Sequence, residues 1–244
     1  MLDSTFLDDI HEPFNTRRFS IGRRPMEGFI YTPERPQQPW ESRNHWMIKG
    51  QSQDCIILDD LEPDVRRFCQ KSLDLMRVFN LPFEDRYLYL TVDDRDLNEG
   101  DIQRQPGWHF DGMQGSEVPS PNPGCFQFLW CDHSPMEFAA QRFQTKGLNR
   151  HEVNLFDSLG NQVRESFVET AKAEVAYLMS PYQLHQGSPA KKAGRRKLLR
   201  LSSSHQPITS IRMTINPYIE YDYDYHTTSG AIPDHLKVLD LFQS

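Results

Sequence analysis

Hydrophobic residues recur every three to four positions between residues 61 and 79. The apolar positions are Leu61, Val65, Phe68, Cys69, Leu73, Met76 and Phe79. This spacing is typical of a helix with one buried face. Pro82 follows the segment, and a proline disfavours helical conformation in the residue before it. The pattern therefore predicts an amphipathic helix over residues 61–79 that ends before Pro82.

Downstream of this helix the hydrophobic pattern changes to a period of two. In residues 87–92 the side chains of Tyr87, Tyr89 and Thr91 alternate with Leu88, Leu90 and Val92. A period of two with many β-branched and aromatic residues indicates β-strands. Comparable segments occupy residues 125–130, 173–179, 198–204 and 211–215. The sequence thus predicts at least five strands after the helix.

The remaining segments have no sustained apolar period. Residues 12–55 carry five prolines and many polar residues, which predicts irregular structure around a core. A length of 244 residues fits one large domain of mainly β class with flanking helices. We expect an irregular N-terminal wrap over about residues 1–60, a β core over about 86–216 and a C-terminal extension over 217–244.

Composition narrows the class of protein. A hydrophobic content of 37% with mixed charges indicates an ordered globular chain. No apolar run approaches the roughly 18 residues of a membrane span, and the acidic N-terminus does not resemble a secretory signal, so a cytoplasmic protein is expected. The four cysteines form no CxxC pair or disulfide framework. The formal charge of −7 disfavours broad binding of a nucleic-acid backbone.

The triplet His109-Phe110-Asp111 is the first candidate for chemistry. With 9 His and 34 acidic residues, about one such HxD triplet is expected by chance, so its context has to carry the argument. His109 and Asp111 lie two positions apart and share one face of an extended segment, while Phe110 faces the opposite side, into packing. His185 lies just before Gly187, after the predicted strand over 173–179. It fits a metal ligand, and it also fits a hydrogen-bonded structural histidine.

Two imidazoles and one carboxylate leave half of an octahedron open, which is the ligand set of non-haem Fe(II) enzymes that activate O2. The order of HxD, a distal His and then an Arg resembles the Fe(II)/2-oxoglutarate-dependent oxygenase superfamily, over about half of the chain. The resemblance implies a double-stranded β-helix, or jelly roll. It implies that His109, Asp111 and His185 bind Fe(II), with 2-oxoglutarate as co-substrate and O2 as oxidant.

Two arginines compete for the far carboxylate of 2-oxoglutarate. Arg196 and Arg200 lie 11 and 15 residues after His185, and both spacings resemble members of the superfamily. Arg200 is preferred because Ser202, two residues later, has a hydroxyl that can reach the same carboxylate. By parity the two arginines share one strand face, so they could also divide the co-substrate and an anionic substrate between them. Tyr89 and Gln127 project polar groups from strands and are candidates to contact either molecule.

The function implied by the resemblance is oxidation of a substrate coupled to decarboxylation of 2-oxoglutarate to succinate and CO2. Asp111 stands where halogenases of the superfamily have a small residue, so hydroxylation, desaturation or ring formation is expected. The acidic chain favours a small metabolite, for example an amino-acid-like one. Two alternatives stay open. The same chemistry could act on nucleic acid or protein side chains, through six cations between Lys191 and Arg200. A jelly-roll binding module could also have the fold without turnover.

Overall fold

The fold consists of two β-sheets and several helices. The structure is a computed structural model that describes residues 2, 4–104, 106–111, 125–133, 135–149, 152–208, 213–221 and 223. Its strands are β1 (Met26–Ile30), β2 (Arg43–Lys49), β3 (Tyr87–Leu97), β4 (Phe126–Cys131), β5 (Glu137–Ala139), β6 (Val168–Thr170), β7 (Val175–Met179), β8 (His185–Gln186) and β9 (Gly194–Ser204). Its helices are α1 (Ser4–His11), η1 (Thr16–Ser20), α2 (Pro63–Val78), α3 (Leu155–Gly160) and η2 (Glu165–Phe167).

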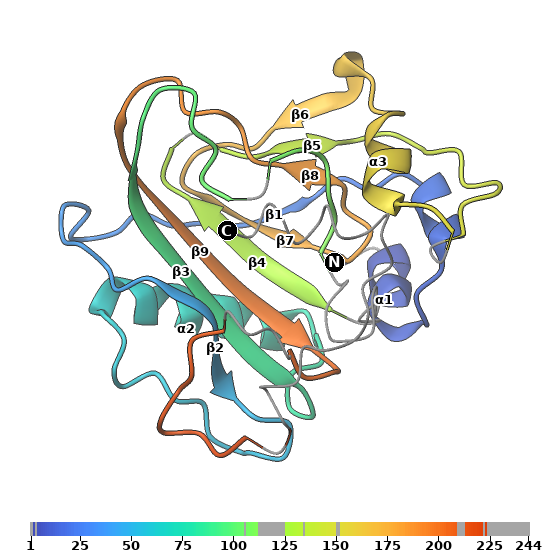
Figure 1. Cartoon of the computed structure of the whole chain (residues 1–244). Coiled ribbons are helices and arrows are strands. Elements are labelled where there is room, and N and C mark those ends of the chain that lie inside the picture. The colour runs from blue at the N-terminus through green and yellow to red at the C-terminus, as the bar shows by residue number, and fades with distance from the viewer. Residues whose placement is uncertain are drawn as a thin grey trace.

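The larger sheet has six strands in the order β1-β7-β4-β9-β3-β2, all paired antiparallel. β3 and β9 pair along their whole length, from Tyr87 opposite Ser204 to Leu97 opposite Gly194. A smaller sheet has the order β6-β5-β8 (Figure 1). The expectation of a mainly β protein with a few helices is therefore confirmed.

Helix α2 covers one face of the six-stranded sheet (Figure 1). Pro63 stands at its N-terminal end, where a missing N–H costs nothing. Its buried residues include Val65, Phe68, Leu73 and Met76, as the three-to-four spacing predicts. They form one apolar cluster with the inward side chains of the sheet, which are Leu88, Leu90, Phe126, Phe128, Trp130, Leu199 and Leu201. Burial of this apolar area is the main stabilising contribution to the fold.

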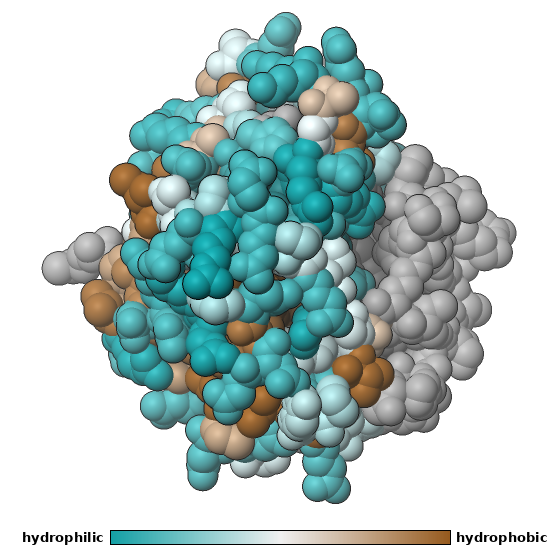
Figure 2. Space-filling model, turned by 90° about the vertical axis from the view of Figure 1, so that its left-hand side faces the viewer, coloured by the Kyte–Doolittle hydropathy of each residue, from teal (hydrophilic) through white to brown (hydrophobic). Residues whose placement is uncertain are grey.

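The smaller sheet packs against the opposite face of the larger one. Phe138 of β5 belongs to the same buried cluster as Leu129, Tyr177, Met179 and Leu198 from β4, β7 and β9. Both faces of the large sheet are therefore covered, one by α2 and the other in part by β5, β6 and β8. The view turned by 90° shows a mainly hydrophilic surface with small, separate hydrophobic patches (Figure 2).

Several sequence predictions of secondary structure were wrong. The N-terminal wrap contains α1 and both edge strands, β1 and β2. Each edge strand has a register shift, between Glu27 and Phe29 in β1 and at two places in β2, and such bulges interrupt the period of two. Residue 211 lies outside the described part of the chain, and residues 213–215 are not in a strand. In the part of the chain described, no helix has the length and apolar character needed to cross a membrane.

Candidate functional site

His109 and His185 face each other across a short antiparallel bridge. The backbone N–H of His109 donates to the carbonyl of His185 at 2.9 Å, and the reverse bond is 2.8 Å. Residues paired in this way project their side chains to the same side. The two imidazole rings have centroids 4.4 Å apart. The convergence of these two distant histidines, which the sequence suggested, is present in the fold.

Asp111 completes the group. Its Oδ2 lies 3.4 Å from Nε2 of His185, and its Oδ1 lies 3.3 Å from Nη1 of Arg200. The side-chain amide of Gln127 also donates to Oδ2. Phe110, between the two candidate ligands, points to the other side and is 2% exposed in an aromatic cluster. The alternation of His109, Phe110 and Asp111 is therefore as the sequence predicted.

Backbone carbonyls orient both imidazoles. Nδ1 of His109 contacts the carbonyl oxygen of Gly107 at 2.9 Å, and Nδ1 of His185 contacts the carbonyl oxygen of Gln183 at 2.9 Å. Because a carbonyl only accepts, the Nδ1 atom of each ring carries a proton that it donates. This is the usual outer contact of a metal-ligating histidine. Gly107 has φ +80°, a conformation that glycine adopts without strain.

Burial and neighbouring charges determine the protonation states of His109 and Asp111. Burial, and next the neighbouring His185, lower the pKa of His109 to about 4. Burial alone would raise the pKa of Asp111, but the charge of Arg200 and the hydrogen bond with His185 lower it well below its usual value. A neutral imidazole and an ionised carboxylate are the forms that bind a metal.

The three side chains do not yet have the geometry of a metal centre. Among the residues that the structure describes, no group of three or more His, Cys, Asp and Glu side chains is placed to hold a metal ion. The carboxylate of Asp111 is directed to Gln127 and Arg200 as well as to His185. The donor types, two imidazoles and one carboxylate, fit Fe(II), and metal binding would have to exchange these contacts of the carboxylate.

Arg200 lies beside this group, at the middle of β9. It stands opposite Thr91 of β3 and Leu129 of β4. Nη2 of Arg200 lies 3.4 Å from Oγ1 of Thr91 and 3.4 Å from Nε2 of His45. Its Nε is buried and has no hydrogen-bond partner among the described residues. A buried guanidinium with spare donors is suited to a carboxylate ligand.

Arg196 has a different role from the one considered in the sequence. Its Nε donates to the carbonyl of His133 at 2.7 Å and its Nη1 to Oε1 of Gln103 at 2.6 Å, and the residue is 1% exposed. Arg200 lies four positions further along the strand, a rise of about 13 Å. The two arginines share a face of β9, yet only Arg200 contacts Asp111.

The three other candidate residues, Gln127, Ser202 and Tyr89, have different partners. Gln127 touches Asp111 and so belongs to the site. The hydroxyl of Ser202 lies 3.5 Å from Oε1 of Gln127. The hydroxyl that contacts the Arg200 guanidinium is that of Thr91, at 3.4 Å. The hydroxyl of Tyr89 contacts that of Tyr223 at 2.9 Å and accepts from the N–H of Ile208. Tyr89 therefore holds the C-terminal segment, and its hydroxyl is not directed at Asp111.

The sequence reasoning missed His45 and Arg104. His45 lies in a bulge of β2 with φ +46°, and burial with the charges of Arg200 and Arg104 lowers its pKa well below the usual value. Arg104 lies in the irregular segment after β3 and interacts with Arg200 and Asp111 through charge. Periodicity gave no signal for either residue, because neither lies in a regular alternating segment.

The basic run between Lys191 and Arg200 is not a free cationic surface. Arg195 pairs with Asp94 at 2.6 Å, and Arg196 and Arg200 are buried. The ammonium group of Lys197 donates to two backbone carbonyls and lies 4.1 Å from the ring of Trp40. Four of the six cations, Arg195, Arg196, Lys197 and Arg200, thus have partners within the fold. This removes the main feature that favoured nucleic acid.

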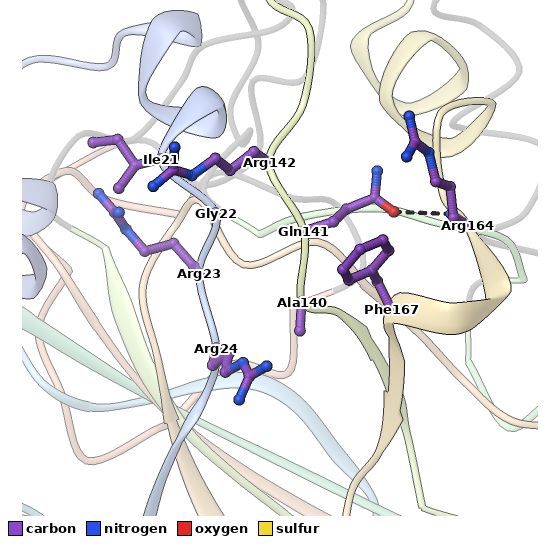
Figure 3. A pocket seen from close by; sticks show the side chains of 9 residues that line it. All are labelled: Ile21, Gly22, Arg23, Arg24, Ala140, Gln141, Arg142, Arg164 and Phe167. Carbon is purple, nitrogen blue, oxygen red and sulfur yellow. Dashed lines mark hydrogen bonds between the residues drawn. The ribbon is translucent and has the colours of Figure 1, made fainter.

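A hollow of about 510 Å³ is lined by residues outside this group, among them Gly22, Gln141 and Phe167 (Figure 3). Four arginines line it, but Arg23 is paired with the buried Asp9 at 2.6 Å and Arg24 with Glu169 at 3.1 Å. The side chains of Arg142 and Arg164 extend in different directions in Figure 3. Two of the four arginines that line the hollow are therefore already paired with carboxylates.

Comparison with solved structures gives distant likenesses. No protein-family model matches the chain, and no curated protein matches it. The crystal structure of AviO1 from Streptomyces viridochromogenes Tue57 is similar with a TM-score of 0.37 and 15% identity, over 79% of this chain and 80% of that one. A nickel complex of the non-heme monooxygenase ThoJ is similar with a TM-score of 0.30 and 12% identity, over 71% and 67%. Because both TM-scores are below 0.5, the functional argument depends on the side chains.

Proposed function

We propose that the chain is a non-haem Fe(II)/2-oxoglutarate-dependent oxygenase of a small-molecule substrate, built as a double-stranded β-helix. The observation that carries the proposal is the meeting of His109, Asp111 and His185 next to Arg200, from segments that lie up to 91 residues apart. Two antiparallel sheets packed on each other, with the site at β8, support the fold assignment.

Different residues of the chain would bind Fe(II) and 2-oxoglutarate. Nε2 of His109, Nε2 of His185 and the carboxylate of Asp111 would hold Fe(II). Arg200, with the hydroxyl of Thr91, would bind the far carboxylate of 2-oxoglutarate by charge-assisted hydrogen bonds. Gln127 would keep the carboxylate of Asp111 oriented once Arg200 turns to the co-substrate. Fe(II) with 2-oxoglutarate supplies the activation of O2 that oxidises the substrate and releases succinate and CO2.

The surrounding residues keep one side of the site dry. Phe110 packs against Phe19 and Phe156, with ring centroids 4.8 Å apart in each pair. The ring of Phe156 also lies 6.2 Å from that of His109. Exclusion of water from this side strengthens the electrostatic interactions of the site and limits side reactions.

The direct solution test is anaerobic titration of the protein with Fe(II) and 2-oxoglutarate under nitrogen. We expect a weak visible charge-transfer band that requires both components, and release of succinate after air is admitted. The matched variants are Arg200→Ala, which should need more 2-oxoglutarate to develop the band, and Arg196→Ala, which should not. A protein that binds neither Fe(II) nor 2-oxoglutarate would contradict the proposal.

A binding module without turnover is the second candidate. The observation that favours it is that, within the described residues, the three metal donors are not in the arrangement of a metal centre. Such a module would bind a carboxylate at Arg200 with no need for a metal. It predicts 2-oxoglutarate binding that is independent of Fe(II), and no succinate. Succinate release, even without a substrate, rules it out.

A further inference from the structure

A second arginine, Arg104, lies within charge range of Arg200 and Asp111. Burial, and then the charge of Arg200, lower the pKa of Arg104 to about 10. Its side chain keeps 32% of its surface exposed, so it remains open to a ligand. Two cations that act on each other through charge are stabilised by an anion placed between them.

The protein contacts of Arg104 are weak ones. Its Nη1 lies 3.4 Å from Oδ2 of Asp93, and its Nη2 lies 3.3 Å from Oδ1 of Asn44. Charge-assisted bonds are usually 2.7–2.9 Å long. Asp93 meanwhile accepts two short bonds from Arg95, at 2.6 and 2.9 Å. The nearest carboxylate is thus already neutralised by another arginine.

The charges of the site leave one positive charge in excess. With Asp93 assigned to Arg95, the described residues contribute Arg104 and Arg200 against Asp111, which is two positive charges against one negative charge. Fe(II) and 2-oxoglutarate would add two charges of each sign, so the excess remains after both bind. A further anion beside Arg104 would balance this excess positive charge.

His45 adds a hydrogen-bond donor at the same place. It is held neutral by burial and by the two arginines, and its Nε2 accepts from Arg200, so Nδ1 carries the proton. Nδ1 is buried and has no hydrogen-bond partner within the described residues. A buried donor without a partner costs about 1–3 kcal/mol, and the φ of +46° adds backbone strain. Both costs are typical of a position kept for a ligand.

We propose that Arg104, together with the Nδ1–H of His45, binds a carboxylate of the substrate beside the co-substrate held by Arg200. The inference rests on the proposed function and adds the substrate class to it, a small carboxylic acid. The guanidinium of Arg104 supplies the charge, and the imidazole of His45 supplies a fixed neutral donor. A neutral substrate would leave the positive charge and the donor unpaired.

The test compares small carboxylic acids with their primary amides as probes. The probes are N-acetylated amino acids and the corresponding amides, added to protein saturated with Ni(II) and 2-oxoglutarate so that Arg200 is occupied and no turnover occurs. Binding is measured by calorimetry and by the shift of the thermal midpoint. For the wild type, at least one acid should bind about tenfold more tightly than its amide.

Variants assign this preference to Arg104. Arg104→Gln should bind the acid and its amide equally, and Arg104→Lys should recover part of the preference. The matched control is Arg77→Gln, which also removes an arginine from a carboxylate, that of Asp74 at 2.8 Å, but lies on α2 outside the site, and it should keep the full preference. Circular dichroism of each variant reports whether the fold is retained.

Two results would overturn the inference. One is a wild type that does not distinguish any acid from its amide, and the other is an Arg104→Gln variant that keeps the preference. Failure of the proposed function gives a different signature, because Ni(II) and 2-oxoglutarate would then not shift the thermal midpoint of the wild type. In that case the same acid and amide pairs, measured without metal, still support the carboxylate site if the preference depends on Arg104.

Discussion

The two faces of the six-stranded sheet are both buried but differ in chemistry. The face toward α2 carries a large cluster of apolar side chains, among them Leu90, Phe128 and Leu201. The opposite face carries Thr91, Gln127, Arg200 and Ser202, all at most 8% exposed. Burial of polar and charged groups opposes folding unless they are paired. The proposed function accounts for these buried polar residues as ligand-binding groups.

The largest expected effect is on the apolar face. Phe128→Ala should lower the free energy of unfolding by about 3–5 kcal/mol, because it removes a fully buried ring and leaves a cavity. Urea denaturation measures this loss. The protein that stays folded should bind 2-oxoglutarate with unchanged affinity. A large change in that affinity would show that the two faces do not act separately.

On the polar face, Asp111→Ala should abolish retention of Fe(II) while the fold persists. The variant removes the only carboxylate that contacts both His185 and Arg200 among the described residues. Metal content after gel filtration, measured by mass spectrometry, checks the outcome. Asp132→Ala is the matched control, since Asp132 also pairs with a histidine, His133 at 2.8 Å, outside the site. Equal metal content in both variants would contradict the ligand assignment.

A smaller effect is expected for Arg200→Ala. Loss of a charge-assisted hydrogen bond, worth about 1.5–3 kcal/mol, should raise the dissociation constant of 2-oxoglutarate about ten- to a hundredfold. Calorimetric titration of the Ni(II)-loaded protein measures it. Arg196→Ala should instead reduce stability and leave this constant unchanged, since Arg196 bonds only within the fold in the part described. The reverse result would exchange the roles of the two arginines.

The last effect concerns pH and the metal-free protein. The pKa of His109 is about 4 in the folded state and 6.5 in its ordinary state, so the unfolded chain binds a proton first as the pH falls. Stability from this residue is therefore present above about pH 6.5 and is lost between pH 6.5 and 4. Denaturation of His109→Gln should show a weaker dependence on pH across this window than the wild type. Parallel profiles for the two proteins would contradict this assignment.

Much of the fold could be predicted from periodicity, and the exceptions have physical causes. Helix α2 and strands β3, β4, β7 and β9 have regular patterns because each buries a continuous face. The edge strands β1 and β2 were missed because bulges break their alternation. Local pattern therefore predicts an element only where its geometry is regular.

The sequence predicted only part of the candidate site, because periodicity identifies residues of regular elements alone. Parity placed Arg196 and Arg200 on one face, but it could not say which of them reaches Asp111, because that depends on where β8 and residues 107–111 cross the sheet. His45 and Arg104 come from a bulge and an irregular segment, so only the three-dimensional structure brings them to the site.

The measurement that tests the central claim most directly is an anomalous-scattering map, recorded at the iron edge, of crystals grown with Fe(II) and 2-oxoglutarate under nitrogen. The account predicts one strong peak bounded by Nε2 of His109, Nε2 of His185 and the carboxylate of Asp111, with the far carboxylate of 2-oxoglutarate on Arg200. Iron bound elsewhere, or no iron beside a 2-oxoglutarate that contacts Arg200, would contradict it.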